Sequence, residues 1–365
     1  MTRRQPDWAI LGCVLTLLSI GLLMVGSSSS VRALETLNDS FYYLKRQALW
    51  SIIGLGVMAW TMRLDYQVIR KYARVFFLLT LVSIIAVLIP GIGQVAGGAR
   101  RWLVIGPLRF QPSELMKLAI VVYVAWALSR VPERVKSFTR GILPYVILVG
   151  VVFLLILQQP DLGTAAAVAG TVVLMLFAAG ARLGHLALLG VVALLGGAYA
   201  VVGQEYRRSR WDAYINPFAD PQGSGFHIIQ ALYALGSGGL FGLGLGNSRQ
   251  KFFYLPAEHT DFIFAILGEE IGFVGAVFVI GLFVLLAWRG YNTAARAPDS
   301  FSSLLAAGIT TMIVLQAMLN IAVVCGVLPI TGVPLPLVSF GGSSLVPTLA
   351  GVGLLLNISR HRALA

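Results

Sequence analysis

Three carboxylates stand at the start of an apolar helix and inside it, within residues 254–275 of this sequence. Asp261 lies where a polar segment turns into an apolar helix, and Glu269 and Glu270 follow inside that helix. A charge at the centre of a bilayer costs roughly 2.5 to 3.5 kcal/mol on insertion scales, so such carboxylates face a wet cavity or a partner. A buried carboxylate flanked by cations is typical of a general base that meets an anionic substrate, and it equally describes a proton-coupled transporter.

A second charged group opens another apolar run, residues 113–129. Gln111 precedes this run, and Glu114 and Lys117 share one face of a helix because they are three residues apart. Both runs begin on the same side of the membrane in the topology below. Glu114, Lys117 and Asp261 are therefore predicted to form a cluster at comparable depth. The alternative is an ion pair between Glu114 and Lys117 that only holds helices together.

Cations gather in two loops that the same topology places outside the membrane. The loop at 91–112 carries Arg100 and Arg101 beside Trp102, and also Arg109. The loop at 204–260 carries Arg207, Arg208, Arg210, Arg249 and Lys251. Because Arg forks suit phosphate oxygens, these cations predict an anionic ligand at the outer face. The alternative is a solvated loop that faces lipid headgroups.

Two turns contribute further candidate residues. Asp161 stands at a helix entrance, where it is predicted either to belong to the site or to be a helix cap only. The uncharged segment 329–344 is punctuated by Pro and Gly and leads into the last apolar run. Non-helical backbone at that depth is typical of a cavity wall. His227 and His259 are too isolated to predict a metal site.

Composition places the chain in a membrane. Its 365 residues are 58% hydrophobic and 12% charged, and the mean hydropathy is +0.84, far from soluble globular proteins. A helix of about 20 apolar residues spans a bilayer. Ten such runs occur, at 8–26, 48–62, 75–90, 113–129, 142–158, 164–180, 184–203, 261–288, 301–328 and 342–357. The predicted fold is all-α: one polytopic domain, residues 1–365, with a large extracytoplasmic loop at about 204–260 between the seventh and eighth helices.

Charge predicts the orientation. With both termini in the cytoplasm, most Lys and Arg residues fall on the inner side, as the positive-inside rule requires. The net charge of +12 is scattered over short loops, so it does not predict binding to nucleic acid. The two cysteines lie in apolar runs and predict neither a disulfide nor a metal site. Residues 226–235 predict a short re-entrant or interfacial helix, and Gly268 with Gly272 predict close packing of helices.

Four motifs occur in order along the chain: GARRW with FQPSELMK, QQPDLGTA, GNSRQK followed by LPAEHTDFIFAILGEEIG, and TGVPLPLVSFGGSS. In order and spacing they resemble the SEDS family of peptidoglycan glycosyltransferases, which includes FtsW of cell division and RodA of elongation. The resemblance covers essentially the whole chain. The GNSRQK segment is more similar to FtsW than to RodA.

The resemblance implies an enzyme that polymerises lipid II into glycan strands at the outer face of the bacterial cytoplasmic membrane, in cell division or elongation. It maps the family's essential acidic residue onto Asp261, its charged pair onto Glu114 and Lys117, and its basic motif onto Arg101. Asp261 is predicted to take a proton from the 4-hydroxyl of the lipid II GlcNAc. Arg101 and a divalent cation, Mg²⁺ or Mn²⁺, are predicted to hold the departing undecaprenyl diphosphate.

The predicted site and partners extend further. Asp261, Lys117 and Glu114 are the predicted catalytic residues, and no metal ligand is assigned. The predicted substrate-binding residues are Arg101, Trp102, Gln111, Asp161, Lys251, His259, Ser339 and Ser343. The implied partners are a class B penicillin-binding protein, which is a transpeptidase, lipid II and its glycan product, other divisome or elongasome proteins, and membrane lipids.

Two segments depart from the family pattern, and two other functions remain open. Residues 256–261 read PAEHTD where members usually read PEAHTD, and Leu337 and Phe340 replace an aromatic residue and a tyrosine. The alternatives to the enzyme are a flippase for lipid II and a non-catalytic scaffold for the transpeptidase. A flippase needs polar residues along the full membrane depth. Here the charges concentrate in the outer half, apart from Glu269 and Glu270, which favours the enzyme.

Overall fold

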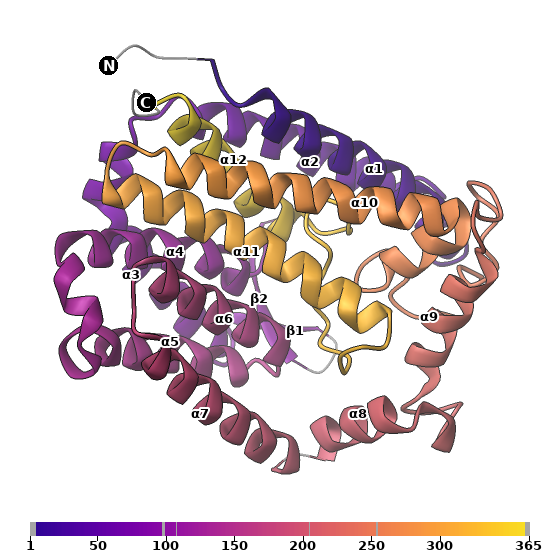
Figure 1. The fold of residues 1–365 in the computed structure, drawn as a ribbon. Helices are drawn as coiled ribbons and strands as arrows, with labels where there is room; N and C mark the ends of the chain where they lie inside the picture. Colours follow the sequence, from indigo (N-terminus) through magenta and orange to yellow (C-terminus); the bar gives the residue numbers. More distant parts are fainter. Residues whose placement is uncertain (1–4, 97–98, 107, 204, 253–254, 362–365) are drawn as a thin grey trace.

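The computed structural model describes residues 5–96, 99–106, 108–203, 205–252 and 255–361. Long helices dominate it, and both termini lie at the same end of the molecule (Figure 1). The helices are α1 (Trp8–Leu37), α2 (Tyr42–Thr61), α3 (Tyr66–Leu88), α4 (Pro112–Arg130), α5 (Leu143–Leu157), α6 (Leu162–Ala178), α7 (Leu183–Val202), α8 (Glu205–Ile215), α9 (Phe226–Ser237), α10 (Ile263–Ala295), α11 (Ser300–Val324) and α12 (Gly342–Ser359). Short 3-10 or π turns occupy Pro132–Lys136, Phe138–Ile142 and Pro217–Ala219.

Each predicted membrane run overlaps one of these helices, although the boundaries differ. Among the described residues, seven helices are long and apolar enough to cross a membrane. They are α1, α3, α4, the helix at Phe138–Leu157 that contains α5, α10, α11 and α12. Two further apolar helices, Leu162–Ala178 and Leu183–Gly197, are shorter. The chain is thus a multi-pass, predominantly helical membrane protein.

Aspartate side chains begin several of the long helices. Asp7, Asp65, Asp161 and Asp299 each accept a hydrogen bond from a backbone N–H group in the first turn of α1, α3, α6 and α11, respectively. These N–H groups have no partner within the helix, so the carboxylate satisfies them and stabilises the helix start. Asp161 is therefore a helix cap, and its predicted place in the site is a separate question.

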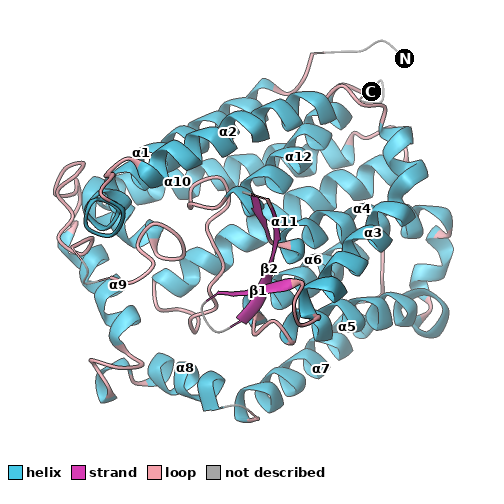
Figure 2. Ribbon diagram, turned by 180° about the vertical axis from the view of Figure 1, so that it is seen from behind, coloured by secondary structure: helices cyan, strands magenta, loops and turns pink. Residues whose placement is uncertain are grey.

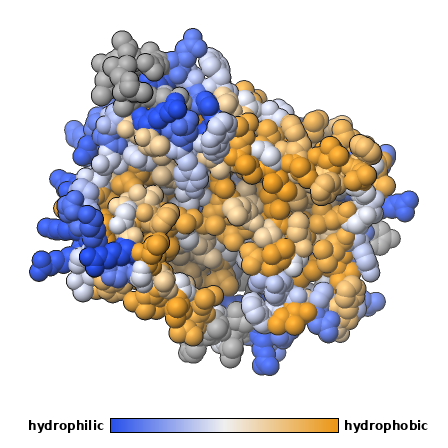
Figure 3. Space-filling model, viewed as in Figure 1, coloured by the Kyte–Doolittle hydropathy of each residue, from blue (hydrophilic) through white to orange (hydrophobic). Residues whose placement is uncertain are grey.

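The helices pack into one bundle. Helix α12 packs against α2, α10 packs against α1 and α11, and α4 packs against α3 and α11. Phe264, Phe301 and Met116 are among the largest fully buried side chains. Apolar residues also cover much of the outer surface, while hydrophilic residues gather at the end that holds the termini (Figure 3). Exposed apolar surface of this extent is expected where a protein contacts lipid.

A small antiparallel sheet stands in a segment for which the sequence predicted only a loop. It has the order β1 (Gly93–Ala96), β2 (Ala99–Ile105) and β3 (Leu108–Phe110), and Figure 2 shows it against the helices. Leu103 pairs with Gly93 on one side and with Phe110 on the other. The sheet contacts α3 and α4. The all-α prediction holds for the bundle and misses this sheet.

The long loop before α10 contains two helices of its own. Helix α9 (Phe226–Ser237) confirms the short helix predicted at 226–235, and its Ile228, Ile229 and Ala231 are buried. Helix α8 was not predicted. Helices α7 and α8 form an arm along the lower edge of the molecule (Figure 1).

Helix α10 is broken at Gly272, which has φ 75° and ψ −172°. Glycine takes such a positive φ without a steric penalty. The N–H groups of residues 273–274 donate to the carbonyl groups of residues 239–240, at 2.9 and 3.1 Å. The carbonyl groups of residues 269–270 accept from the N–H groups of residues 243–244, both at 3.0 Å. The loop thus satisfies the backbone that the break frees, as an apolar environment demands.

This break corrects the prediction for the G-x-x-x-G pair. Gly268 does allow a helix to approach closely, because a Cβ atom there would lie 2.5 Å from the Leu235 side chain of α9. The prediction of helix packing is wrong for Gly272, which interrupts its helix and admits a loop. Spacing alone does not distinguish these two uses of glycine.

The two deep carboxylates and Lys251 hold the same loop, and we call these three residues the loop anchor. Glu269 accepts hydrogen bonds from the Ser248 hydroxyl, at 2.5 Å, and from the N–H groups of residues 249–250, at 3.0 and 3.4 Å. Glu270 accepts from the Ser27 hydroxyl at 2.6 Å and pairs with Lys251 at 3.3 Å. Both carboxylates are fully buried and occupied by protein partners.

Candidate active site

Asp261 precedes α10, and its backbone is fixed at three consecutive carbonyl groups. The His259 carbonyl accepts from the N–H of Phe340 at 2.9 Å. The Thr260 carbonyl accepts from the Ser339 hydroxyl at 2.6 Å, and the Asp261 carbonyl accepts from the Asn320 amide at 2.8 Å. The segment 329–344 and helix α11 therefore hold the residue that the sequence singled out.

The predicted cavity wall lies directly against the Asp261 side chain. Gly332 has φ +72°, and a Cβ atom there would lie 3.6 Å from Oδ2 of Asp261. On its other side the same segment meets the start of α6, because a Cβ atom on Gly163 would lie 2.7 Å from the Thr331 carbonyl oxygen. Residues 331–333 thus pass between the helix that Asp161 caps and the Asp261 carboxylate.

Burial governs the electrostatics of these two aspartates. Loss of water, together with the Asp161 charge, raises the pKa of Asp261 to about 6, while Arg210, Arg101 and His259 oppose the rise. Loss of water also raises the pKa of Asp161, against the lowering effect of Arg101. A carboxylate with a pKa near 6 is largely ionised at neutral pH, yet it holds a proton more strongly than an ordinary aspartate, as a general base requires.

Arg101 joins the small sheet to the turn that precedes α6. Its Nε donates to the Gln159 carbonyl at 2.6 Å, and its Nη2 donates to the Pro160 carbonyl at 2.5 Å. The guanidinium stays partly exposed. Trp102 follows in the same strand, where it pairs with Gln94 of β1 and is half-buried.

Glu114 and Lys117 form a buried ion pair on α4, with 2.7 Å between Oε2 and Nζ. Lys117 Nζ also donates to Oε1 of Gln316 on α11, at 2.7 Å. The charge of Glu114 acts on Asp161, whose pKa it raises. The predicted cluster of Glu114, Lys117 and Asp261 is therefore connected through α11, with Gln316 at the Lys117 end and Asn320 at the Asp261 end.

His259, Gln111 and Lys251 lie in different surroundings. His259 packs on Tyr43, with 4.6 Å between ring centroids, and its Nδ1 is 3.5 Å from Oε1 of Glu258. Gln111 donates to Ser113 at 3.0 Å and lies 3.5 Å from Oδ2 of Asp161. Lys251 belongs to the loop anchor and is buried there. Its role in substrate binding stays a prediction.

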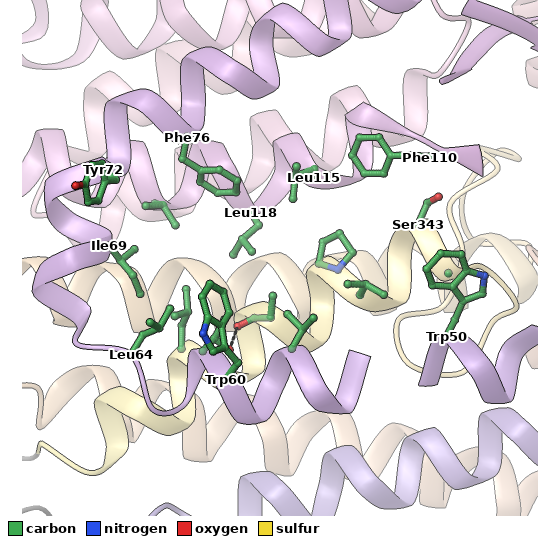
Figure 4. Close-up of a pocket in the computed structure, with 18 of the residues that line it drawn as sticks. Trp50, Trp60, Leu64, Ile69, Tyr72, Phe76, Phe110, Leu115, Leu118 and Ser343 are labelled. Carbon is green, nitrogen blue, oxygen red and sulfur yellow. Dashed lines mark hydrogen bonds between the residues drawn. The ribbon is translucent and has the colours of Figure 1, made fainter. Parts of the chain in front are cut away.

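A deep apolar groove of about 650 Å³ opens between α2, α3, α4 and α12. Trp60, Phe76 and Leu118 face into it, and Ser343 stands at the end near Trp50 and Phe110 (Figure 4). Arg109 lines the groove as well, and its carbonyl accepts from the Ser343 hydroxyl at 3.3 Å. The groove is apolar along its length, and Arg109 and Ser343 stand at the end near Trp50 and Phe110, an arrangement that suits a lipid chain with its headgroup at that end.

Several buried polar atoms near the aspartates have no hydrogen-bond partner among the described residues. They include both side-chain polar atoms of Gln159, Oγ1 of Thr331 and Oδ1 of Asn320. Buried polar groups normally find partners. These atoms therefore form a polar cluster that can hydrogen-bond a ligand or bind an ion.

Asp161 and Gln159 carry the kinds of oxygen ligand that a divalent cation takes. Asp161 supplies a carboxylate and Gln159, two residues away, supplies an amide oxygen without a partner among the described residues. Mg²⁺ and Mn²⁺ prefer such oxygen ligands and keep several waters. No group of three His, Cys, Asp or Glu residues converges in the described part of the chain, so a cation here would also need water or substrate oxygens.

Sequence reasoning missed three amides that complete this site, and it named Arg210 only as one of the cations of the long loop. Gln47 brackets the wall, because its amide donates to the Ser339 carbonyl at 3.1 Å and accepts from the Gly341 N–H at 3.1 Å. Gln316 and Asn320 hold the α11 side, and Arg210 donates to the Ile330 carbonyl at 3.0 Å. For Gln316 and Asn320, their place inside the apolar run 301–328 was the available signal, because burial of such a group is costly unless it is hydrogen-bonded.

The chain is similar to proteins of one family over its whole length. The model for FtsW, RodA and SpoVE, described as "Cell cycle protein", matches residues 7–364. Stage V sporulation protein E of Bacillus subtilis strain 168 is 47% identical over 359 residues, which cover 98% of each chain. The Geobacter sulfurreducens protein named "Probable peptidoglycan glycosyltransferase FtsW" is 46% identical over 97% of this chain and 95% of its own.

Solved structures agree with these relatives. A chain of the structure called "Structural coordination of polymerization and crosslinking by a peptidoglycan synthase complex" has a TM-score of 0.81 and 34% identity, covering 98% of both chains. The crystal structure of the rod shape determining protein RodA of Thermus thermophilus has a TM-score of 0.73 and 31% identity, covering 99% of this chain and 98% of its own.

Proposed function

This chain belongs to the FtsW, RodA and SpoVE family of cell cycle proteins, and from that premise we propose that it is a peptidoglycan glycosyltransferase. Its reaction is the polymerisation of lipid II into glycan strands at the outer face of the bacterial cytoplasmic membrane. The observation that carries the proposal is Asp261, a buried carboxylate with its pKa raised to about 6, held by Asn320 and influenced by the charges of Asp161, Arg210 and Arg101.

The chemistry follows from these groups. The ionised Asp261 accepts the proton of the GlcNAc 4-hydroxyl of one lipid II, and the hydroxyl oxygen forms a bond to the anomeric carbon of the growing strand. The bond from that carbon to the diphosphate breaks, and the lipid diphosphate leaves with the electron pair. Arg101 and Arg210 supply positive charge where negative charge develops on the leaving group. Glu114 and Lys117 act from α4, through the contacts with α11.

A divalent cation belongs to the proposal as well. Asp161 and Gln159 would hold it, because both supply oxygen ligands in the turn to which Arg101 donates. When bound, such a cation supplies positive charge for the diphosphate. Removal of divalent cations by a chelator is expected to lower the polymerisation rate and to leave the protein folded.

The apolar groove gives the substrate a place in the membrane. A lipid diphosphate combines a long apolar chain with a charged head, and the groove combines an apolar length with Arg109 and Ser343 at one end. We assign the isoprenoid chain of the substrate to this groove. In the predicted topology, with ten spans and both termini cytoplasmic, this end of the groove faces the outer surface.

The partner in this proposal is a class B penicillin-binding protein. A structural relative comes from a structure called a peptidoglycan synthase complex that coordinates polymerization and crosslinking. Crosslinking is the task of a transpeptidase, so an enzyme of that class is the expected neighbour in the membrane. Whether the chain acts in division, elongation or sporulation would depend on the transpeptidase that it binds.

A flippase is the less favoured alternative because its path would need polar groups at depth. Glu269 and Glu270 are the charges that the sequence offers for such a path. Both are buried in the loop anchor with protein partners, so they are unavailable to a moving headgroup.

Polymerisation of labelled lipid II by the purified protein tests the proposal. Asp261→Asn is expected to lower the rate by about 10²- to 10⁴-fold, the usual contribution of a general base. Asp220→Asn is the matched control, since Asp220 is an exposed aspartate of the same long loop. Glycan formation by Asp261→Asn at the rate of the unsubstituted protein would contradict the proposed role, and movement of lipid II without glycan would favour the flippase.

A further inference from the structure

Two amide side chains lie one turn apart on α11 and face the candidate site. Gln316 and Asn320 are 3% and 2% exposed. Gln316 contacts Lys117 and the carbonyl of Pro334, and Asn320 contacts the carbonyl groups of Val333 and Asp261. One face of α11 thus touches all three segments that bring the predicted catalytic residues together: the start of α4, the segment 329–344 and the start of α10.

The chemistry of the partners fixes the orientation of both amides. Asn320 Nδ2 donates to the carbonyl oxygens of Asp261 and Val333, both at 2.8 Å, and only the NH₂ group can serve two acceptors. Gln316 Oε1 accepts from Lys117 Nζ at 2.7 Å, so its Nε2 is turned toward the Pro334 carbonyl, at 2.9 Å. Each amide therefore joins one active-site segment to the same stretch of cavity wall.

We infer that Asn320 is a positioning residue for the Asp261 carboxylate, and that Lys117 acts on Asp261 through Gln316, the wall segment 333–334 and Asn320. The inference rests on the proposed function and goes beyond it. It explains how an ion pair on α4 can matter to a carboxylate for which the described residues give no direct bond to Lys117. Catalysis depends on the position of the reacting groups, and a displacement of about 1 Å can lower a rate about 10²-fold.

A purely structural role is the competing explanation, and the chain contains a matched control for it. Asn357 of α12 is also 2% exposed, and its Nδ2 donates to two loop carbonyls, those of Met62 and Leu64. Its Oδ1 has no described partner, as is true of Asn320. Asn357 joins the loop between α2 and α3, which is remote in sequence and fold from the segments around Asp261. Both asparagines donate to two backbone carbonyl groups, but these carbonyl groups belong to different segments.

The first experiment compares Asn320→Leu with Asn357→Leu, since leucine keeps the shape of asparagine and removes the donors. Polymerisation of lipid II is measured at saturating and at limiting substrate, per amount of folded protein, with the unfolding temperature in detergent. Asn320→Leu is expected to lower kcat about 10- to 100-fold with KM changed less than about two-fold. Asn357→Leu is expected to lower the unfolding temperature by a similar amount and to keep kcat. The loop that Asn357 holds carries Leu64 of the apolar groove, so KM is not used for this comparison.

The second experiment is a double-mutant cycle on Lys117→Met and Gln316→Met. If Lys117 acts through Gln316, the double variant loses no more activity than the more impaired single variant. Additive losses would overturn the path through Gln316. A kcat of Asn320→Leu equal to that of Asn357→Leu would overturn the role of Asn320. Both results keep their meaning only if the unsubstituted protein polymerises lipid II and Asp261→Asn does not, so failure of the proposed function is recognised separately.

Discussion

Among single residues, Asp261 shows how burial creates a base from an ordinary side chain. An exposed aspartate has a pKa near 3.9 and little tendency to take a proton from a sugar. Burial beside Asp161 raises the pKa of Asp261 to about 6, and the cations of Arg210 and Arg101 limit the rise. Because the folded pKa is above the unfolded value, folding favours the protonated form, and this contribution to stability is lost as pH rises from about 4 through 6.

The pH profile of kcat/KM is the direct test of this electrostatic balance. Activity is expected to rise with pH through a midpoint near 6, because only ionised Asp261 accepts a proton. Among the cations, Arg210 lowers the pKa of Asp261 most, so the activity of Arg210→Gln is expected to have its midpoint at a higher pH. Arg208→Gln is the control from the same helix, because Arg208 is exposed and pairs with Asp212. A midpoint for Arg210→Gln at or below that of the control would contradict the assignment.

The residues of the site divide by the kind of signal that they leave in a sequence. Charges in apolar runs are expensive, so Asp261, Glu114 and Lys117 stand out in the sequence, and their roles in the site stay predictions. Gln316 and Asn320 escaped because a neutral amide inside a helix resembles any polar residue on an interhelical face. Their function appears only when the partner carbonyls are known, and those lie on other segments.

Among the elements, α10 is the clearest case in which local pattern and tertiary structure disagree. Its sequence is apolar on both sides of Gly272, so nothing in the pattern predicts a break. The break exists because a loop supplies the missing backbone partners, and that loop is held by carboxylates eight and nine residues after Asp261. The small sheet was missed for a related reason: its strands are short, and their pairing depends on the turns.

Substitution of Gly272 tests the break. Gly272→Ala places a Cβ atom at φ +75°, where it would meet the backbone of residues 240–242, with the Leu240 carbonyl oxygen at 2.6 Å. The expected loss in the free energy of unfolding is at least about 1 to 3 kcal/mol from backbone strain, before the clash is counted. Gly281→Ala, in the same helix with open space around it, is expected to be neutral or slightly stabilising.

Thermal unfolding in detergent measures both glycine variants. A break required by the fold gives a large drop in unfolding temperature for Gly272→Ala and little change for Gly281→Ala. Equal effects at the two positions would mean that α10 can run unbroken. The loop anchor would then not be what breaks the helix at Gly272.

At the scale of the molecule, composition predicted a helical membrane bundle, and the structure and the relatives agree with it. Orientation is a different matter, because it depends on the membrane and on charge bias across it. The distribution of Lys and Arg predicts that both ends of the chain lie in the cytoplasm and the start of α10 outside. One native cysteine allows this to be tested, since Cys325 ends α11 and is exposed while Cys13 is buried.

Labelling of intact cells with a membrane-impermeant maleimide tests the orientation. Cys325 is expected to react from outside without permeabilisation, because it is exposed at the outer end of α11. In a Cys325→Ser background, Ser300→Cys at the opposite end of α11 is expected to react only after permeabilisation. The reverse result would invert the topology and place Asp261 on the cytoplasmic side.

The groove between α2, α3, α4 and α12 has a further consequence for how such an enzyme works repeatedly. Transfer of a hydrocarbon chain from lipid to water costs about 0.8 kcal/mol per CH₂ group, so an isoprenoid chain of many units could not be withdrawn from the bilayer at each cycle. The groove lets the isoprenoid chain enter and leave within the plane of the membrane, in contact with hydrocarbon throughout. Traffic of substrate and spent carrier then becomes two-dimensional diffusion, and only the sugars need to reach water.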